Sequence, residues 1–239
     1  MKKINLIIML SIIFALESCT NTKDKFINPD SVSPDIYQVL FENDAVKVMK
    51  VTFQPNQSDK THDHHPMTFH ALKGGKIEVT LPDGKTNERN IPTGATGFNS
   101  DLMRHQVKNI GDNTIEILLV ENKYSMNSEV NGSDLILPEE VSPDVYKILL
   151  DNDKVKVTEA TFEPDQSDKM HEHGVMTFYT VSGGKAQNTL ADGTVREMEI
   201  SDNFTGHGEK ILKHQMKNIG EKTIKVILVE HKTLEPVKG

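Results

Sequence analysis

The sequence predicts an all-β protein made of two tandem β-barrels of jelly-roll type. The first observation is an internal repeat, in which residues 33–123 realign with residues 142–232 at a constant offset of 109 positions, with about half of the aligned residues identical. The second is the hydrophobic pattern after residue 30, which has period two or forms short apolar runs. The third is the frequency of Gly and Asp/Asn turn signals between these runs, which is typical of short antiparallel strands.

Each copy is expected to form seven or eight short strands. In the first copy the expected strands cover 37–41, 46–53, 67–72, 76–81, 88–91, 104–108 and 115–121. Turn signals separate them, and the shared pairs Gly74-Gly75 and Gly183-Gly184 are interpreted as hairpin turns. The predicted domains are therefore 33–123 and 142–239, and they are expected to pack as an intramolecular pseudo-dimer. The linker 124–141 contains an apolar stretch at 135–137 that is expected to pack on a domain.

The N-terminus has the features of an export signal. Lys2 and Lys3 precede an apolar run, 4–16, that is too short to span a bilayer comfortably but has the length of a signal-peptide core. The run ends in Leu-Glu-Ser-Cys, which resembles a bacterial lipobox with Glu17 in place of the usual small residue. We therefore predict a signal peptide over 1–18, lipidation of Cys19 and a polar tether over 19–32. The alternative is a signal cleaved elsewhere, which would leave Cys19 as a free thiol.

These features predict a protein of the cell envelope, anchored by lipid to the membrane, with the outer membrane and its periplasmic or surface face as the expected location. Cys19 is the single cysteine, so the chain cannot form an intramolecular disulfide. The formal net charge is −8, and no basic stripe or aromatic stacking surface is visible. A nucleic-acid partner is therefore not expected.

The histidine pattern predicts two metal sites. In a strand, His62 and His64 would project two imidazoles toward one point, because residues i and i+2 share a face. His105 is suited to supply a third imidazole from a neighbouring strand. The second copy repeats the trio at the same offset, as His171, His173 and His214. Three neutral imidazoles are a familiar ligand set for a divalent Fe, Zn, Mn, Ni or Cu ion. The alternative is a decayed site in which these are ordinary polar residues.

Other polar residues are weighed by comparing the copies. His70 follows His64 by six residues and so would share its strand face, and its equivalent Tyr179 is also a polar ring. Both are candidates for a pocket or for a contact behind the metal ligands, and ordinary packed rings are the alternative. Three histidines are not shared between the copies and are expected to have a solvated or local role: His65, His207 and His231. Two shared pairs before the His-x-His motifs are interpreted as solvated salt bridges or turn residues: Asp59-Lys60 and Asp168-Lys169.

These motifs resemble those of the cupin superfamily. The family's first motif, His-x-His-x(3 or 4)-Glu-x6-Gly, is matched by His62, His64 and Gly75 and again by the second copy, and its second motif is matched by His105 with Asn109 and by His214 with Asn218. The resemblance covers 33–123 and 142–232, and it implies two tandem cupin-like jelly-roll barrels, a bicupin. Thr68 and Thr177 stand at the position of the family's Glu, so the implied site has three His ligands with a Thr close by.

Two functions remain open from the sequence. The first is an enzyme, a metal-dependent dioxygenase or isomerase that acts on a small polar metabolite, because a three-His site resembles that of some cupin dioxygenases. The second is a non-catalytic module that binds a metal, a sugar or a small anion. A scaffold of the envelope is a third and weaker reading. Either of the first two has a small molecule as its partner, and no catalytic residue is assigned.

Overall fold

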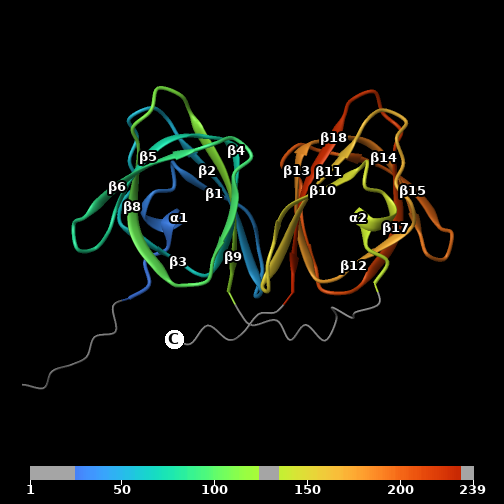
Figure 1. The fold of residues 1–239 in the computed structure, drawn as a ribbon, viewed down its shortest axis with the longest axis horizontal. Coiled ribbons are helices and arrows are strands. Elements are labelled where there is room, and N and C mark those ends of the chain that lie inside the picture. Colours follow the sequence, from blue (N-terminus) through green and yellow to red (C-terminus); the bar gives the residue numbers. More distant parts are fainter. Residues whose placement is uncertain (1–24, 124–134, 233–239) are drawn as a thin grey trace, which may run out of the picture.

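A computed structural model of the chain describes residues 25–123 and 135–232. The predicted signal peptide, Cys19, the first part of the tether and most of the linker lie outside these residues. The described residues form two β-barrels side by side, one from each copy of the repeat (Figure 1). This confirms the predicted all-β fold of two tandem barrels.

The first barrel consists of two antiparallel sheets that face each other. The five-stranded sheet has the order β1-β2-β9-β4-β7, and the four-stranded sheet has the order β3-β8-β5-β6. A single turn of helix, α1 (Pro29–Val32), precedes them. The strands are β1 (Tyr37–Glu42), β2 (Val46–Phe53), β3 (His62–His64), β4 (Met67–Lys73), β5 (Gly75–Thr80), β6 (Thr86–Ile91), β7 (Thr96–Asn99), β8 (Met103–Asn109) and β9 (Ile115–Asn122).

The second barrel repeats this arrangement. Its sheets have the orders β10-β11-β18-β13-β16 and β12-β17-β14-β15, preceded by the helical turn α2 (Pro138–Val141). The strands are β10 (Tyr146–Asp151), β11 (Val155–Phe162), β12 (His171–His173), β13 (Met176–Ser182), β14 (Gly184–Leu190), β15 (Val195–Ile200), β16 (Thr205–Gly208), β17 (Leu212–Asn218) and β18 (Ile224–His231).

Alternation along β9 shows how one strand serves two surfaces. Ile115 and Leu119 point into the first barrel, where they pack in its core. Leu118 and Val120 point to the other side, where they pack against Val155 and other residues of the second barrel. Residues on opposite faces of a strand alternate, so a near-continuous apolar run is required when both faces are buried. The two five-stranded sheets thus pack against each other through their outer faces, as expected for an intramolecular pseudo-dimer.

The prediction that the Gly pairs form hairpin turns is wrong. Gly74 connects β4, in the five-stranded sheet, to β5, in the four-stranded sheet, so the chain turns a corner between sheets there. A Cβ atom on Gly74 would lie 2.1 Å from the carbonyl oxygen of Ile91, and one on Gly183 would lie 2.0 Å from that of Ile200. Gly is required because the backbone approaches another strand closely at this corner.

The segments that enter each barrel are held by the residue between the two His of the motif. The backbone N–H of Ile27 donates to Asp63 Oδ2 at 2.7 Å, and the N–H of Ile136 donates to Glu172 Oε2 at 3.0 Å. The end of the predicted tether and the apolar end of the linker therefore lie against the barrels. Among the residues that the structure describes, no helix is long and apolar enough to cross a membrane.

Candidate metal centres

The structure brings the first predicted trio together. β3 pairs with β8 in antiparallel register, with His62 directly opposite His105. Cross-strand partners share a face, and His64 lies on the same face two residues on, so the three imidazoles converge inside the barrel. One ring nitrogen from each of the three lies within 4.8 Å of the others, and all three side chains are buried. The predicted use of a sequence-distant strand for the third imidazole is confirmed.

Hydrogen bonds fix which nitrogen of the His62 and His64 rings faces the centre. His62 Nδ1 lies 2.7 Å from the carbonyl oxygen of Lys60, which can only accept, so Nδ1 carries the proton. His64 Nδ1 lies 2.5 Å from Glu121 Oε1 and donates to it. The two Nε2 atoms then face each other as lone pairs only 2.7 Å apart. Such lone pairs repel unless a cation lies between them, so the arrangement fits a metal ion.

The electrostatics also keep two of the imidazoles, His62 and His105, neutral. Burial, with the neighbouring His64, lowers the pKa of His62 to about 4. Burial, then the other two imidazoles and then the charge of Arg89, lowers the pKa of His105 to about 3. A neutral imidazole is the form that binds a metal. At neutral pH these rings are therefore ready to coordinate.

The second trio has the same geometry. His171 lies opposite His214 in the register of β12 and β17, and the Nε2 atoms of His171 and His173 are 2.8 Å apart. Burial and His173 lower the pKa of His171 to about 4. One difference is that His214 Nδ1 donates to Asn188 Oδ1 at 3.1 Å, whereas His105 Nδ1 is buried without a partner among the described residues.

A glutamate behind each trio was missed by the sequence analysis. Glu121 is 1% exposed and accepts the hydrogen bond from His64, and Glu230 accepts from His173 at 3.1 Å. Burial raises the pKa of Glu230, but its hydrogen bonds from His173 and Lys156 outweigh this and hold the pKa below its usual value. A carboxylate in this position orients the ring and increases its basicity as a ligand. The signal was present, because both copies end an apolar inward-facing row of β9 or β18 with a Glu.

The interpretation of Asp59 and Asp168 as solvated residues is wrong. Asp59 is 2% exposed, and it accepts from the Tyr37 hydroxyl at 2.8 Å and from the Val107 N–H at 2.6 Å. Burial raises the pKa of Asp59 to about 6. The Tyr37 oxygen also lies 3.1 Å from His62 Nε2, the atom that faces the centre. Tyr146 and Asp168 repeat the arrangement at His171.

The prediction that Thr68, His70, Thr177 and Tyr179 adjoin the metal centres or the pocket is also wrong. Thr68 lies opposite Val120 in the sheet, and His70 lies opposite Leu118, both of which pack between the barrels. Thr177 and Tyr179 have the equivalent register in β13, opposite Val229 and Ile227. The break after β3, at His65-Pro66, shifts the alternation by one residue, so Met67 and Phe69 face the interior instead.

The unshared histidines have local roles, as expected, but the solvated reading fails for one of them. The ring of His65 stacks on Phe26 with a centroid distance of 4.3 Å. His231 is fully buried between the barrels, where its Nε2 lies 2.9 Å from Thr177 Oγ1. His207 Nδ1 lies 3.0 Å from the same hydroxyl. None of the three belongs to a metal trio.

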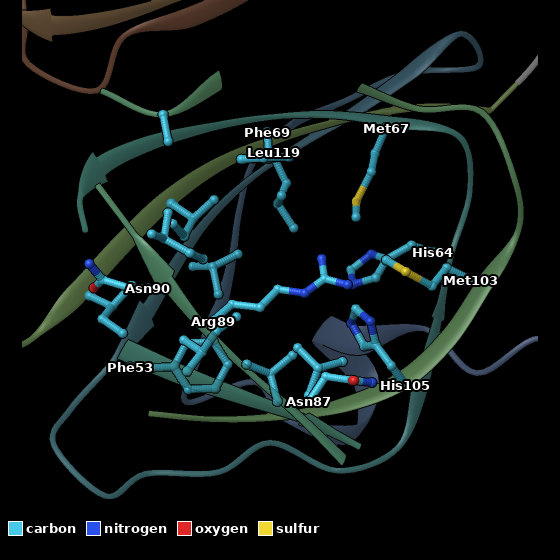
Figure 2. Close-up of a pocket in the computed structure, with 18 of the residues that line it drawn as sticks. Phe53, His64, Met67, Phe69, Asn87, Arg89, Asn90, Met103, His105 and Leu119 are labelled. Atoms are coloured by element: carbon cyan, nitrogen blue, oxygen red, sulfur yellow. The ribbon is translucent and has the colours of Figure 1, made fainter. Parts of the chain in front are cut away.

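The first trio adjoins a cavity of about 400 Å³ inside the first barrel (Figure 2). His64 and His105 line the cavity, and most of the remaining wall is apolar, with Phe53, Phe69 and Leu119 among its members. Arg89 of β6 extends into the cavity toward the histidines. The sequence analysis did not single out Arg89, because the second copy has Met198 there.

No protein-family model matches the chain, and no curated protein matches it by sequence. Solved structures do match its fold. A variant of Bacillus subtilis oxalate decarboxylase is 12% identical with a TM-score of 0.59, covering 84% of this chain and 73% of its own. A second oxalate decarboxylase structure is 15% identical with a TM-score of 0.58, covering 81% and 71%.

AerE from Microcystis aeruginosa is 12% identical with a TM-score of 0.55, covering 84% of this chain and 98% of its own. These likenesses extend across both barrels, and at such low identity they concern the fold. Together with the paired His trios, they show that the chain has a bicupin fold, with a three-His constellation in each barrel.

Proposed function

We propose that the protein holds one divalent metal ion in each barrel and that the first centre acts on a small molecule in the adjoining cavity, as a metal-dependent oxygenase or isomerase. The observation that carries the proposal is the convergence of three buried or partly buried imidazoles beside a mostly apolar cavity. The six proposed ligands are His62, His64, His105, His171, His173 and His214. Three protein ligands leave positions on an ion open for substrate or oxygen.

The protein's own residues prepare this centre. Glu121 holds the proton on His64 Nδ1, so that Nε2 presents a lone pair to the ion. Tyr37 places a hydroxyl beside the centre, and burial together with Asp59 raises its pKa well above the usual value, so it remains protonated. The Tyr37 hydroxyl donates its proton to Asp59, so its oxygen is available to a bound ligand as a hydrogen-bond acceptor. A bound ion would supply Lewis-acid or redox chemistry, depending on its identity.

A binding module is the second candidate, and one observation favours it. Apart from the imidazoles and Tyr37, the polar side chains on the cavity wall are Asn87, Arg89 and Asn90, and none of them is a general base. Oxygen uptake by the metal-loaded protein, supplied with a mixture of small organic acids, would distinguish the candidates. An enzyme consumes oxygen or converts an acid, and the His62→Ala/His64→Ala variant does not. Binding of an acid without its conversion would support the binding module.

We also propose that the mature protein is exported and anchored by lipid at Cys19 to the cell envelope. The support is the sequence of 1–19 alone, with its basic start, apolar run and lipobox-like end. A bicupin held in this way would face water on the membrane surface.

Elemental analysis of the protein, purified without added metal, tests the metal centres. We expect up to two equivalents of one divalent metal, chosen from Fe, Zn, Mn, Ni and Cu. His62→Ala/His64→Ala should remove one equivalent, and His171→Ala/His173→Ala should remove the other. His65→Ala is the matched control, because His65 adjoins the motif but stacks on Phe26 outside the centre. Unchanged metal in both double variants would overturn the proposal.

A further inference from the structure

Arg89 is an exposed residue of β6 whose side chain borders the cavity of the first barrel. In the β5–β6 hairpin it pairs directly with Ile77, and cross-strand partners share a face. Ile77 is buried in the core of the first barrel, so Arg89 also projects inward. Its backbone is at the exposed edge of the sheet, and Figure 2 shows its guanidinium directed into the cavity, toward His64 and Met103.

The guanidinium has no anionic partner inside the cavity. No Asp or Glu belongs to the described residues that line the wall, and Arg89 makes no ion pair within the described parts of the chain. A divalent ion held by the imidazoles would add two positive charges, of which the Glu121 carboxylate offsets one. A guanidinium beside such a centre has the geometry to bind a carboxylate through two parallel hydrogen bonds. The polar end of the cavity is thus suited to an anion.

The rest of the wall is suited to an apolar body. Three side chains that surround the space between Arg89 and the far wall are Phe53, Phe69 and Leu119. A volume of about 400 Å³ falls within the range of small-molecule pockets. A small dianion with no apolar part would leave most of this wall in contact with water. The surface therefore favours a ligand with one charged end.

The second barrel differs at the corresponding positions. Met198 replaces Arg89 opposite Ala186, and Asn188 replaces Val79. Asn188 uses its side-chain oxygen to accept the proton of His214 Nδ1. The second barrel does carry an inward-facing arginine, Arg196, but it pairs with Asn188, one step nearer the hairpin turn. The two interiors are therefore built for different contents.

We propose that the first barrel, and not the second, binds an organic monocarboxylate with an apolar body, and that Arg89 holds the carboxylate beside the metal centre. This inference rests on the proposed function and specifies the substrate class of its first site. Arg89 is a specificity-determining residue in this account. Three properties carry it, namely an unpaired guanidinium, an apolar wall and a neighbouring trio of imidazoles.

Calorimetric titration of the metal-loaded full chain with hexanoate, and separately with 1-hexanol, tests the proposal. The two probes have the same apolar body, and only hexanoate carries a charge. We expect hexanoate to bind with one equivalent per chain and at least tenfold more tightly than 1-hexanol. Equal affinities, or two equivalents of hexanoate, would overturn the proposal.

Arg89→Met, which introduces the residue that the second barrel has at this position, should lower the affinity for hexanoate at least tenfold and leave the affinity for 1-hexanol unchanged. Arg89→Lys should retain part of the preference, because it keeps the charge without the planar fork. Arg196→Met is the matched control in the second barrel and should bind hexanoate as the wild type does. An unchanged hexanoate affinity in Arg89→Met, or an equal loss in Arg196→Met, would contradict the assignment.

Metal analysis of the same samples separates the two levels of the argument. If all variants keep two equivalents of metal and the affinity for hexanoate does not depend on Arg89, the monocarboxylate proposal fails and the metal centres stand. If the wild type holds no metal under conditions that load other three-His sites, the proposed function fails, whatever hexanoate does.

Discussion

Replacing Glu121 with Gln should weaken the first metal centre without unfolding the barrel. The carboxylate is buried, and its Oε1 atom is 2.5 Å from His64 Nδ1, which makes this a strong charge-assisted hydrogen bond. Gln keeps the volume and an acceptor oxygen but removes the charge. Loss of such a partner behind a metal ligand costs about 10–100-fold in metal affinity. We expect the lower end for Glu121→Gln, about 1.4 kcal/mol, and the upper end for Glu121→Ala, about 2.7 kcal/mol.

The second barrel provides an internal comparison. His173 lies 3.1 Å from Glu230, and Glu230 also pairs with Lys156 at 2.7 Å, so that carboxylate is divided between two partners. Glu230→Gln should therefore weaken its centre less than Glu121→Gln weakens the first. Each centre is measured alone, in a chain whose other trio carries the paired His→Ala changes, by competition with a chelator of known affinity.

Glu116→Gln is the matched control for Glu121→Gln. Glu116 is on the same strand, but it is partly exposed and pairs with Lys50 at 2.9 Å. Its replacement should leave metal affinity unchanged. If Glu121→Gln bound metal as tightly as the wild type, or if both variants lost affinity equally, the role assigned to Glu121 would be refuted.

Three further predictions concern pH, packing and anchoring. The metal-free protein should lose stability as the pH falls from 6.5 to about 4, because burial lowers the pKa of His62 and His171 to about 4, so the unfolded chain binds protons there that the folded chain does not. Asp59 and Asp168, whose pKa burial raises to about 6, act with the opposite sign and offset part of the loss. The urea midpoint should therefore be lower at pH 5 than at pH 7, and a midpoint that rises would contradict this. Leu118→Ala, in the packing between the barrels, should lower the free energy of unfolding by about 2–5 kcal/mol in urea titration, and a loss below about 1 kcal/mol would show that this contact is loose. Cys19→Ser should abolish lipid labelling and release the protein from membranes, and labelling that persists would exclude Cys19 as the anchor.

The parts of the site that follow strict alternation could be predicted from the sequence. His62 and His64 are separated by one residue, and the repeat supplied His105 as the missing third ring, so the constellation needed no knowledge of the fold. The same alternation failed for His70, because the strand ends at His64 and the chain resumes in the other sheet. A six-residue interval preserves the face of a side chain only while the strand is continuous.

Residues that act through burial or through one copy alone could not be predicted in this way. Asp is a residue type that usually lies on the surface, so the sequence favours an exposed Asp59. Only the fold shows that the side chain is buried and accepts hydrogen bonds from the Tyr37 hydroxyl and the Val107 N–H. Arg89 was not singled out, because the comparison of copies selects the residues they share and the copies differ there. A function that belongs to one barrel is invisible to that comparison.

The packing between the two five-stranded sheets has a consequence for how the two barrels can evolve. A lone copy of the repeat would leave the outer face bearing Val48, Leu118 and Val120 uncovered, so it would need a partner. When that partner is an identical chain, every substitution appears twice. Joining the two copies in one chain removes this symmetry, because each copy can then be substituted separately. Figure 1 shows β6 and β15 at opposite ends of the molecule, far from the packing between the barrels. One barrel could thus exchange a residue such as Arg89 while the other retained its own chemistry.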